Sequence, residues 1–176
     1  MIRKTSPAIT VFYDTEFTTL DPKRTPQLIS VGCVAEDGRE FYAELSDTYQ
    51  PYDCSEFVVK TVLPLLQRGE ALMLEAQCAN RLQQWIENLG GEVILRSDAP
   101  MYDWPLLEYL FQFYGCWPAN LRRKPGTIYF ENERMGQRYT AALGQFWQSN
   151  SDRRHHALVD ARSLHFAWKA SIKRGI

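Results

Sequence analysis

Residues 9–18 read ITVFYDTEFT, a run of β-branched and aromatic side chains that leads into two carboxylates. Such an apolar run is typical of a buried β-strand. Side chains alternate between the two faces of a strand, so Asp14 and Glu16 point to the same face. We therefore expect a central strand with two acidic groups at its carboxyl end, where open α/β sheets bind their ligands.

Two further strands extend this one into an antiparallel meander. Residues 28–34 (LISVGCV) are apolar, and residues 40–45 (EFYAEL) alternate. Between them, Asp37-Gly38 accepts the positive φ angles of a tight hairpin turn.

Helical patterns alternate with the later strands. Residues 72–89 carry apolar side chains at helical spacing, and Gly90-Gly91 is expected to stop that helix. The next strand, 92–96, should run parallel to the first because a helix precedes it. The other expected elements are a short helix over 57–66, a helix over 104–114 with Pro105 in its first turn, a strand over 127–130 and a last helix capped by Ser151 or Asp152.

Together these elements predict an α/β fold with one mixed sheet of five strands, an antiparallel meander plus parallel strands, flanked by helices. The 176 residues, 45% of them hydrophobic, suit a single domain over 1–176. With 20 basic and 21 acidic residues, the chain lacks a strongly basic surface. Contact with nucleic acid should therefore be local and metal-assisted, as in a small enzyme that acts on ends.

The four cysteines form no CxxC pair and lie at no spacing typical of zinc. The first 20 residues have no signal-peptide pattern, and no apolar run approaches the roughly 18–20 residues of a membrane span. We expect a cytoplasmic protein with reduced thiols and no membrane partner.

Three more chemically active residues follow along the chain. Asp103 lies in YDWPLL (102–107), between a predicted strand and helix, while His155 and Asp160 lie in HHALVDA (155–161). Carboxylates supply the oxygen ligands that Mg²⁺ and Mn²⁺ prefer. Two such ions can flank a phosphate, and a nearby histidine can take a proton from the attacking water.

These segments resemble the Exo I, Exo II and Exo III motifs of the DnaQ-like, DEDDh-type 3′–5′ exonucleases. The phrases that look closest to a bacterial exoribonuclease branch first described in mycobacteria are DTEFT (14–18), LISVG (28–32), AEDGRE (35–40), VVKTVLP (58–64) and HHALVDAR (155–162).

The resemblance implies a ribonuclease H-like fold. It implies Asp14, Glu16, Asp103 and Asp160 as ligands of two Mg²⁺ or Mn²⁺ ions, with His155 as the general base. Two departures are present. Phe17 replaces a small residue of many members, and Ser97-Asp98 replaces the His-Asn of DNA proofreaders, which argues against a proofreading role.

The adjacent histidines offer two assignments. The DEDDh pattern has four residues between histidine and aspartate, which selects His155, whereas His156 would stand where DEDDy enzymes have tyrosine. We expect His156 to be a neighbour that touches substrate or solvent. Asp98, directly after a strand, is either a turn residue or a further ligand.

Substrate contacts are expected from Phe17, Thr18 and Trp104. Phe17 and Trp104 could stack on an unpaired base, which holds it without reading its sequence, or could pack in the core. Arg153 and Arg154 are either solvated charges or phosphate contacts. The basic run 122–124 is either a surface loop or a site for a partner subunit or nucleic acid.

The leading function is a metal-dependent 3′–5′ exonuclease on single-stranded RNA ends or overhangs. A DNA exonuclease of the same chemistry is the alternative, because contact with the 2′-hydroxyl decides between them. A non-catalytic binding module on the same fold would be free to lose a ligand, and none is missing. The sequence leaves open whether the protein forms a homodimer.

Overall fold

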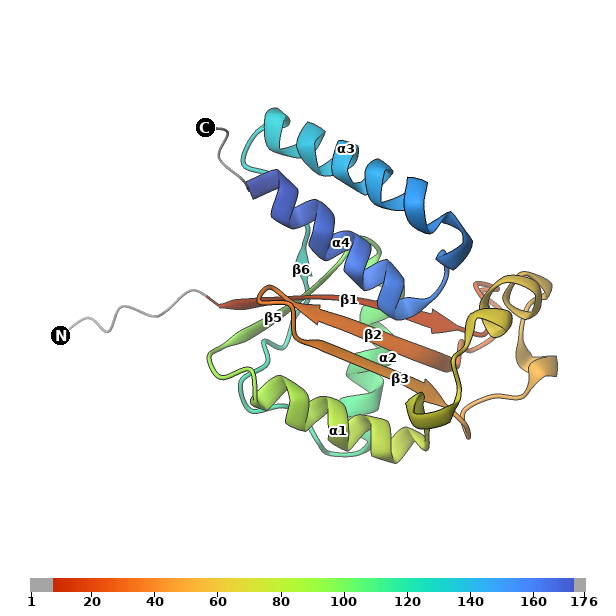
Figure 1. The fold of residues 1–176 in the computed structure, drawn as a ribbon. Helices are drawn as coiled ribbons and strands as arrows, with labels where there is room; N and C mark the ends of the chain where they lie inside the picture. The colour runs from red at the N-terminus through yellow and green to blue at the C-terminus, as the bar shows by residue number, and fades with distance from the viewer. Residues whose placement is uncertain (1–7, 173–176) are drawn as a thin grey trace.

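The computed structural model of the protein describes residues 8–172, in which a six-stranded mixed sheet carries helices on both faces (Figure 1). The order of the sheet is β4-β3-β2-β1-β5-β6. The strands are β1 (Ile9–Phe17), β2 (Leu28–Ala35), β3 (Glu40–Leu45), β4 (Leu72–Met73), β5 (Val93–Ser97) and β6 (Gly126–Thr127). The α-helices are α1 (Glu75–Glu87), α2 (Pro100–Phe113), α3 (Glu133–Asn150) and α4 (Ala157–Ile172). Short 3₁₀ helices lie at Pro51–Asp53, Leu63–Leu65, Gly69–Ala71 and Ser151–Arg153, and a π-helix lies at Val58–Val62, within the short helix expected over 57–66.

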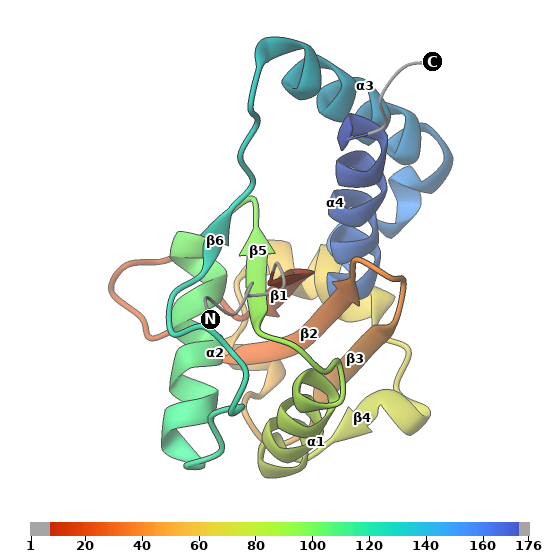
Figure 2. The ribbon, with the colours of Figure 1, turned by 90° about the vertical axis from the view of Figure 1, so that its left-hand side faces the viewer.

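The alternation of β1 divides the molecule into layers. Val11 and Tyr13 belong to the main core, which α1 and α2 cover from one side of the sheet. Phe12 points to the other side, where its ring lies 5.8 Å from that of His165 and 6.0 Å from that of Trp168, both on α4. Figure 2 shows α3 and α4 on the opposite side of the sheet from α1 and α2.

Helix α4 approaches the sheet closely because β2 has a glycine at the crossing point. A Cβ atom on Gly32 would overlap the backbone of Ala157 and Leu158, the first two residues of α4. Gly32 pairs with Asp14 across the β1–β2 ladder. The glycine therefore sets the start of α4 against the acidic end of β1.

The structure confirms the expected meander and its hairpin. β1, β2 and β3 pair antiparallel, β5 pairs parallel to β1, and Gly38 has a φ of 95° in the turn. The expected count of five strands is wrong by one. Leu72–Met73, expected as the first residues of a helix, pairs parallel with β3 as the edge strand β4.

Three other boundaries differ from the sequence prediction. Helix α2 begins at Pro100, so Asp103 lies within its first turn and Pro105 lies deeper than expected. Ser151 and Asp152 form a separate 3₁₀ turn and do not cap α4, which begins at Ala157. Of the strand expected over 127–130, only Thr127 is in a strand, and Ile128 and Phe130 pack against the α3–α4 cluster.

Helix α3 was not expected. Its first turn is capped by the Asn132 side chain, which accepts a hydrogen bond from Met135 N–H at 3.0 Å. Met135, Tyr139 and Ala142 are its buried residues and follow helical spacing, but two glycines interrupt the pattern. None of the helices within residues 8–172 is long and apolar enough to cross a membrane.

Candidate active site

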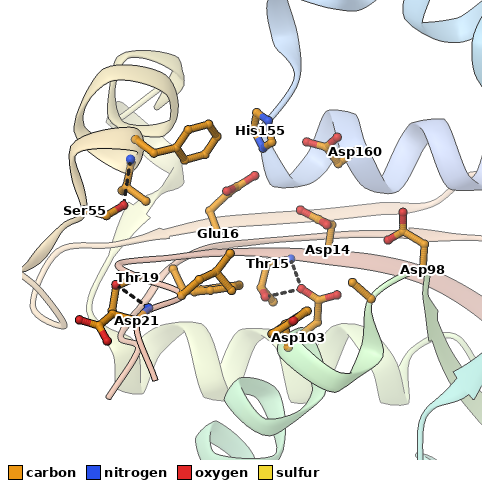
Figure 3. Close-up of a pocket in the computed structure, with 16 residues that line it drawn as sticks. Asp14, Thr15, Glu16, Thr19, Asp21, Ser55, Asp98, Asp103, His155 and Asp160 are labelled. Carbon is orange, nitrogen blue, oxygen red and sulfur yellow. Dashed lines mark hydrogen bonds between the residues drawn. The ribbon is translucent and has the colours of Figure 1, made fainter. Parts of the chain in front are cut away.

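Three carboxylates meet on the α4 side of the sheet. Asp14 and Glu16 end β1, and Asp160 lies in the first turn of α4, with one oxygen of each within 4.8 Å of the others. Figure 3 shows the three side chains pointing toward one another, with His155 beside them. They line a pocket of about 680 Å³. The convergence follows from alternation in β1 and from the close approach of α4 at Gly32.

Burial, followed by the charges of neighbouring carboxylates, raises the pKa values of these groups. Burial, with the charges of Asp160 and Asp103, raises the pKa of Glu16 to about 8. Burial also raises the pKa of Asp160 to about 7 and that of Asp14 well above its usual range. Like charges held together out of water disfavour ionisation unless a cation compensates them.

The donor set fits a hard divalent cation. Asp160 Oδ2 is buried and has no hydrogen-bond partner among the described residues. Three carboxylates with such an unsatisfied oxygen match the oxygen ligands of Mg²⁺ or Mn²⁺. Asp14, Glu16 and Asp160 are therefore the residues able to hold a metal ion here.

Asp103 lines the same pocket but approaches it from the other face of β1. Its Oδ1 accepts hydrogen bonds from the hydroxyl of Thr15 at 2.7 Å and the amide of Thr15 at 3.2 Å, and Oδ2 accepts one from Ser97 Oγ. Figure 3 shows Thr15 and Asp103 together on the side of β1 away from Asp160. Because protein donors occupy both oxygens, a ligand role for Asp103 stays a prediction.

His155 lies just before α4 in an unusual backbone conformation. Its φ is 68°, in the left-handed region that non-glycine residues rarely occupy. Its ring lines the pocket and meets the edge of Phe57 with centroids 5.0 Å apart. Burial, followed by the charge of Arg154, lowers the pKa of His155. The ring is therefore neutral near pH 7, as a general base requires.

The sequence predicted that His156 touches substrate or solvent, but its side chain is buried. It is only 2% exposed, its ring stacks on Tyr42 with centroids 4.6 Å apart, and Nε2 lies 2.9 Å from the side-chain nitrogen of Gln67. Of the two histidines, only His155 lines the pocket. The site thus favours the first of the two assignments.

Of the three expected substrate contacts, one lines the pocket and two are buried elsewhere. Phe17 is half-buried and lines the pocket. Trp104 is 7% exposed and packs edge-on against Trp117, which is the core alternative, and Thr18 is buried with its hydroxyl accepting a hydrogen bond from Gln27 N–H. Neither Trp104 nor Thr18 is among the residues that line the pocket.

Sequence reasoning missed the apolar rim of this pocket. Leu20, Phe57 and Tyr102 line it and are 67%, 54% and 51% exposed. Leu20 and Tyr102 lie close in sequence to the acidic residues of the site. Their position beside predicted metal-binding residues is the sequence signal that could have identified them as pocket residues. Phe57 is far from them in sequence and could not be found that way.

Two charged residues flank the carboxylates. Asp98 lines the pocket, and its charge further raises the pKa of Asp14 and of Asp160. Arg154 lines a smaller adjoining hollow of about 210 Å³, and its guanidinium lies 4.9 Å from the centre of the Trp147 ring. In the basic run, Arg122 pairs with Glu92 and Arg123 stacks on Trp117, so two of its charged side chains already have partners within the protein.

Comparison with known proteins identifies the family. No protein-family model matches the chain. Two curated 3′–5′ exoribonucleases of Mycobacterium tuberculosis, from strains CDC 1551 and H37Rv, are each 33% identical to it over 162 residues, which are 86% of this chain and 86% of theirs. The chain belongs to this family of 3′–5′ exoribonucleases. The resemblance stated from the motifs is thereby confirmed.

Solved structures of exonuclease I share the fold. One matches with a TM-score of 0.57 at 14% identity, covering 90% of this chain and 39% of its own. The zinc-bound Escherichia coli enzyme with single-stranded DNA matches with a TM-score of 0.56 at 13% identity, covering 94% of this chain and 40% of its own. This chain spans about two fifths of those proteins, and the likeness shows the ribonuclease H-like fold alone. As a member of its family, the protein is a 3′–5′ exonuclease.

Proposed function

We propose that this 3′–5′ exonuclease acts on single-stranded RNA ends or overhangs and releases nucleoside 5′-monophosphates with the help of two Mg²⁺ or Mn²⁺ ions. The observation that carries the proposal is the meeting of Asp14, Glu16 and Asp160 in the pocket that His155 also lines. The names of the mycobacterial relatives support RNA as the substrate.

Each residue of the site has its own role in hydrolysis. Asp14, Glu16 and Asp160 would hold the cations. Asp103, the fourth ligand that the family resemblance implies, also fixes Thr15 between the first two of them. Bound cations would stabilise charge on the phosphate and make the attacking water more acidic. His155 takes the proton from that water as its oxygen bonds to phosphorus. The bond from phosphorus to the 3′ oxygen of the preceding nucleotide breaks, and that oxygen takes up a proton from solvent.

The apolar part of the pocket holds the terminal nucleoside. Phe17, Leu20, Phe57 and Tyr102 offer aromatic and aliphatic surface on which a base can stack. Arg154, beside His155 in the adjoining hollow, is placed to contact a phosphate of the chain. Such contacts accept any base, so only weak sequence preference is expected.

Digestion of matched oligonucleotides tests the proposal. RNA and DNA of one sequence, labelled at the 5′ end, are incubated with Mg²⁺, with Mn²⁺ and with a chelator. We expect a ladder that shortens from the 3′ end, with RNA cut faster, and no cutting under chelation. Faster cutting of DNA would overturn the choice of RNA, and cutting of a circular single strand or 3′-monophosphate products would overturn the mechanism.

A further inference from the structure

A buried carboxylate anchors the segment that lies beside the start of α4. Glu44, on β3, is fully buried and accepts hydrogen bonds from the backbone N–H groups of Gln67 and Arg68 at 2.6 and 2.8 Å. The hydroxyl of Tyr42 donates a third bond to it at 2.7 Å. A buried carboxylate with three donors fixes the backbone at 67–68 firmly to the sheet.

The fixed segment in turn holds His156. The side-chain nitrogen of Gln67 lies 2.9 Å from Nε2 of His156, and the His156 ring stacks on Tyr42 at an interplanar angle of 22°. Tyr42 thus contacts both Glu44 and His156. A continuous chain of contacts therefore runs from the sheet through Gln67 to His156, and the proposed chemistry of the site uses none of it.

The backbone of His156 links the two site residues His155 and Asp160. Its carbonyl accepts hydrogen bonds from the N–H groups of Val159 and Asp160 at 2.8 and 3.0 Å, which starts the helix that carries Asp160. Its other neighbour is His155, whose φ of 68° costs free energy and needs surrounding structure to maintain it. Figure 3 shows His155 and Asp160 projecting from this start of α4 toward Glu16 and Asp14.

We propose that His156 is a positioning residue, held by Gln67 and Glu44, which keeps His155 in its left-handed conformation with the ring in the pocket. The inference rests on the proposed role of His155 as general base. Phe57 contacts the ring of His155, and Gln67 contacts the ring of His156. Each end of the segment 57–67 therefore holds one of the two histidines. The segment lies beside the start of α4 in Figure 1. The base is therefore anchored from both sides of the start of α4.

Two substitutions remove the anchoring hydrogen bond and retain the packing. His156→Phe keeps a ring against Tyr42, and Gln67→Leu removes the amide from an exposed side chain but keeps an apolar stem there. His165→Phe is the matched control, because His165 is on α4, which His156 directly precedes, and its Nε2 lies 3.3 Å from the carbonyl of Glu36, outside the pocket. Misplacing a catalytic group by about 1 Å can cost about 10²-fold in rate, so we expect kcat to fall about 10²-fold in both variants with KM unchanged.

A double-mutant cycle separates positioning from general damage. If His156 acts through His155, then His156→Phe should lower kcat far less in a His155→Ala background than in the wild type. A loss of equal size in both backgrounds would overturn the proposal. So would an equal fall in kcat in the His165→Phe control, or an unchanged kcat in His156→Phe.

A measurement without turnover keeps the inference separate from the proposed function. In the metal-free protein, the NMR signals of the His155 ring, assigned by their loss in His155→Ala, should be single and sharp in the wild type and in His165→Phe. They should shift or broaden in His156→Phe and Gln67→Leu, because the ring then samples other conformations. Unchanged signals would overturn the inference even if the enzyme is active. If the wild type proves inactive but the signals still change in His156→Phe and Gln67→Leu, the anchoring is supported and only the proposed function is refuted.

Discussion

The carboxylate of Asp103 is hydrogen-bonded to both the hydroxyl and the backbone amide of Thr15, the residue that separates Asp14 from Glu16. This relationship ties the first turn of α2 to the acidic end of β1. As a consequence, the carboxylates of the site have different environments. Asp14, Glu16 and Asp160 repel one another, whereas hydrogen bonds from Thr15 and Ser97 hold Asp103.

We expect opposite effects on the stability of the metal-free protein from two kinds of alanine substitution. Asp14→Ala or Asp160→Ala should raise Tm, because each relieves repulsion. Asp103→Ala should lower the free energy of unfolding by about 1–3 kcal/mol, because it leaves buried donors unsatisfied. Thermal melts in chelator measure both, with the exposed carboxylate variant Glu70→Ala as the unchanged control. All three aspartate variants should lose hydrolysis, and a stabilised Asp103→Ala would contradict the account of its bonds.

The metal-free protein should lose stability as pH rises. The pKa values of Glu16 and Asp160 in the folded state are about 8 and about 7, above their usual values of 4.5 and 3.8. The folded state thus keeps protons that the unfolded chain releases, so the stabilisation is complete below about pH 4 and lost as pH rises through about 8. Thermal melts across this range should show the decline, and Mn²⁺ should raise Tm more at the alkaline end. An Asp14→Asn, Glu16→Gln, Asp160→Asn triple variant should show a flatter profile.

The rate of hydrolysis should rise with pH and level off early. The pKa of His155 is lowered from 6.5, first by burial and then by Arg154, so the neutral base is already abundant at mildly acid pH. Single-turnover rates at saturating Mn²⁺ should therefore show their inflection below the usual histidine pKa of 6.5. Arg154→Ala should move the inflection to higher pH, and His155→Ala should lose about 10²–10⁴-fold in rate together with the inflection. An inflection that survives in His155→Ala would assign the titration to another group.

Phe17 and Trp104 should respond differently to substitution. Phe17 lines the pocket, so Phe17→Ala should weaken binding of a single-stranded oligonucleotide by about 1–3 kcal/mol with little change in Tm. Trp104 packs in the core, so Trp104→Phe should lower Tm and leave binding unchanged. Fluorescence anisotropy with a labelled strand and thermal melts give the two readouts. Equal binding by wild type and Phe17→Ala would remove Phe17 from the substrate contacts.

Much of the fold was readable from local patterns. The strand over 9–17 and the hairpin at Asp37-Gly38 follow from side-chain alternation and turn chemistry, which act over a few residues. Helix α3 was missed, although Met135, Tyr139 and Ala142 keep helical spacing, because glycines weakened the pattern. Leu72–Met73 became a strand because β3 lies beside it, a contact that no local pattern reports.

The sequence by itself determined which chemistry the protein carries. Asp14 and Glu16 share a face because alternation is a property of the strand alone, and the spacing of His155 from Asp160 is fixed by the chain. Only the tertiary structure decided that Asp103 reaches β1 from the opposite face, that His156 is buried against Tyr42, and that Phe57 joins the pocket. These outcomes depend on how α2, α4 and the 57–67 segment pack on the sheet. Packing brings together residues far apart in sequence, and the periodicity of any one segment carries no information about it.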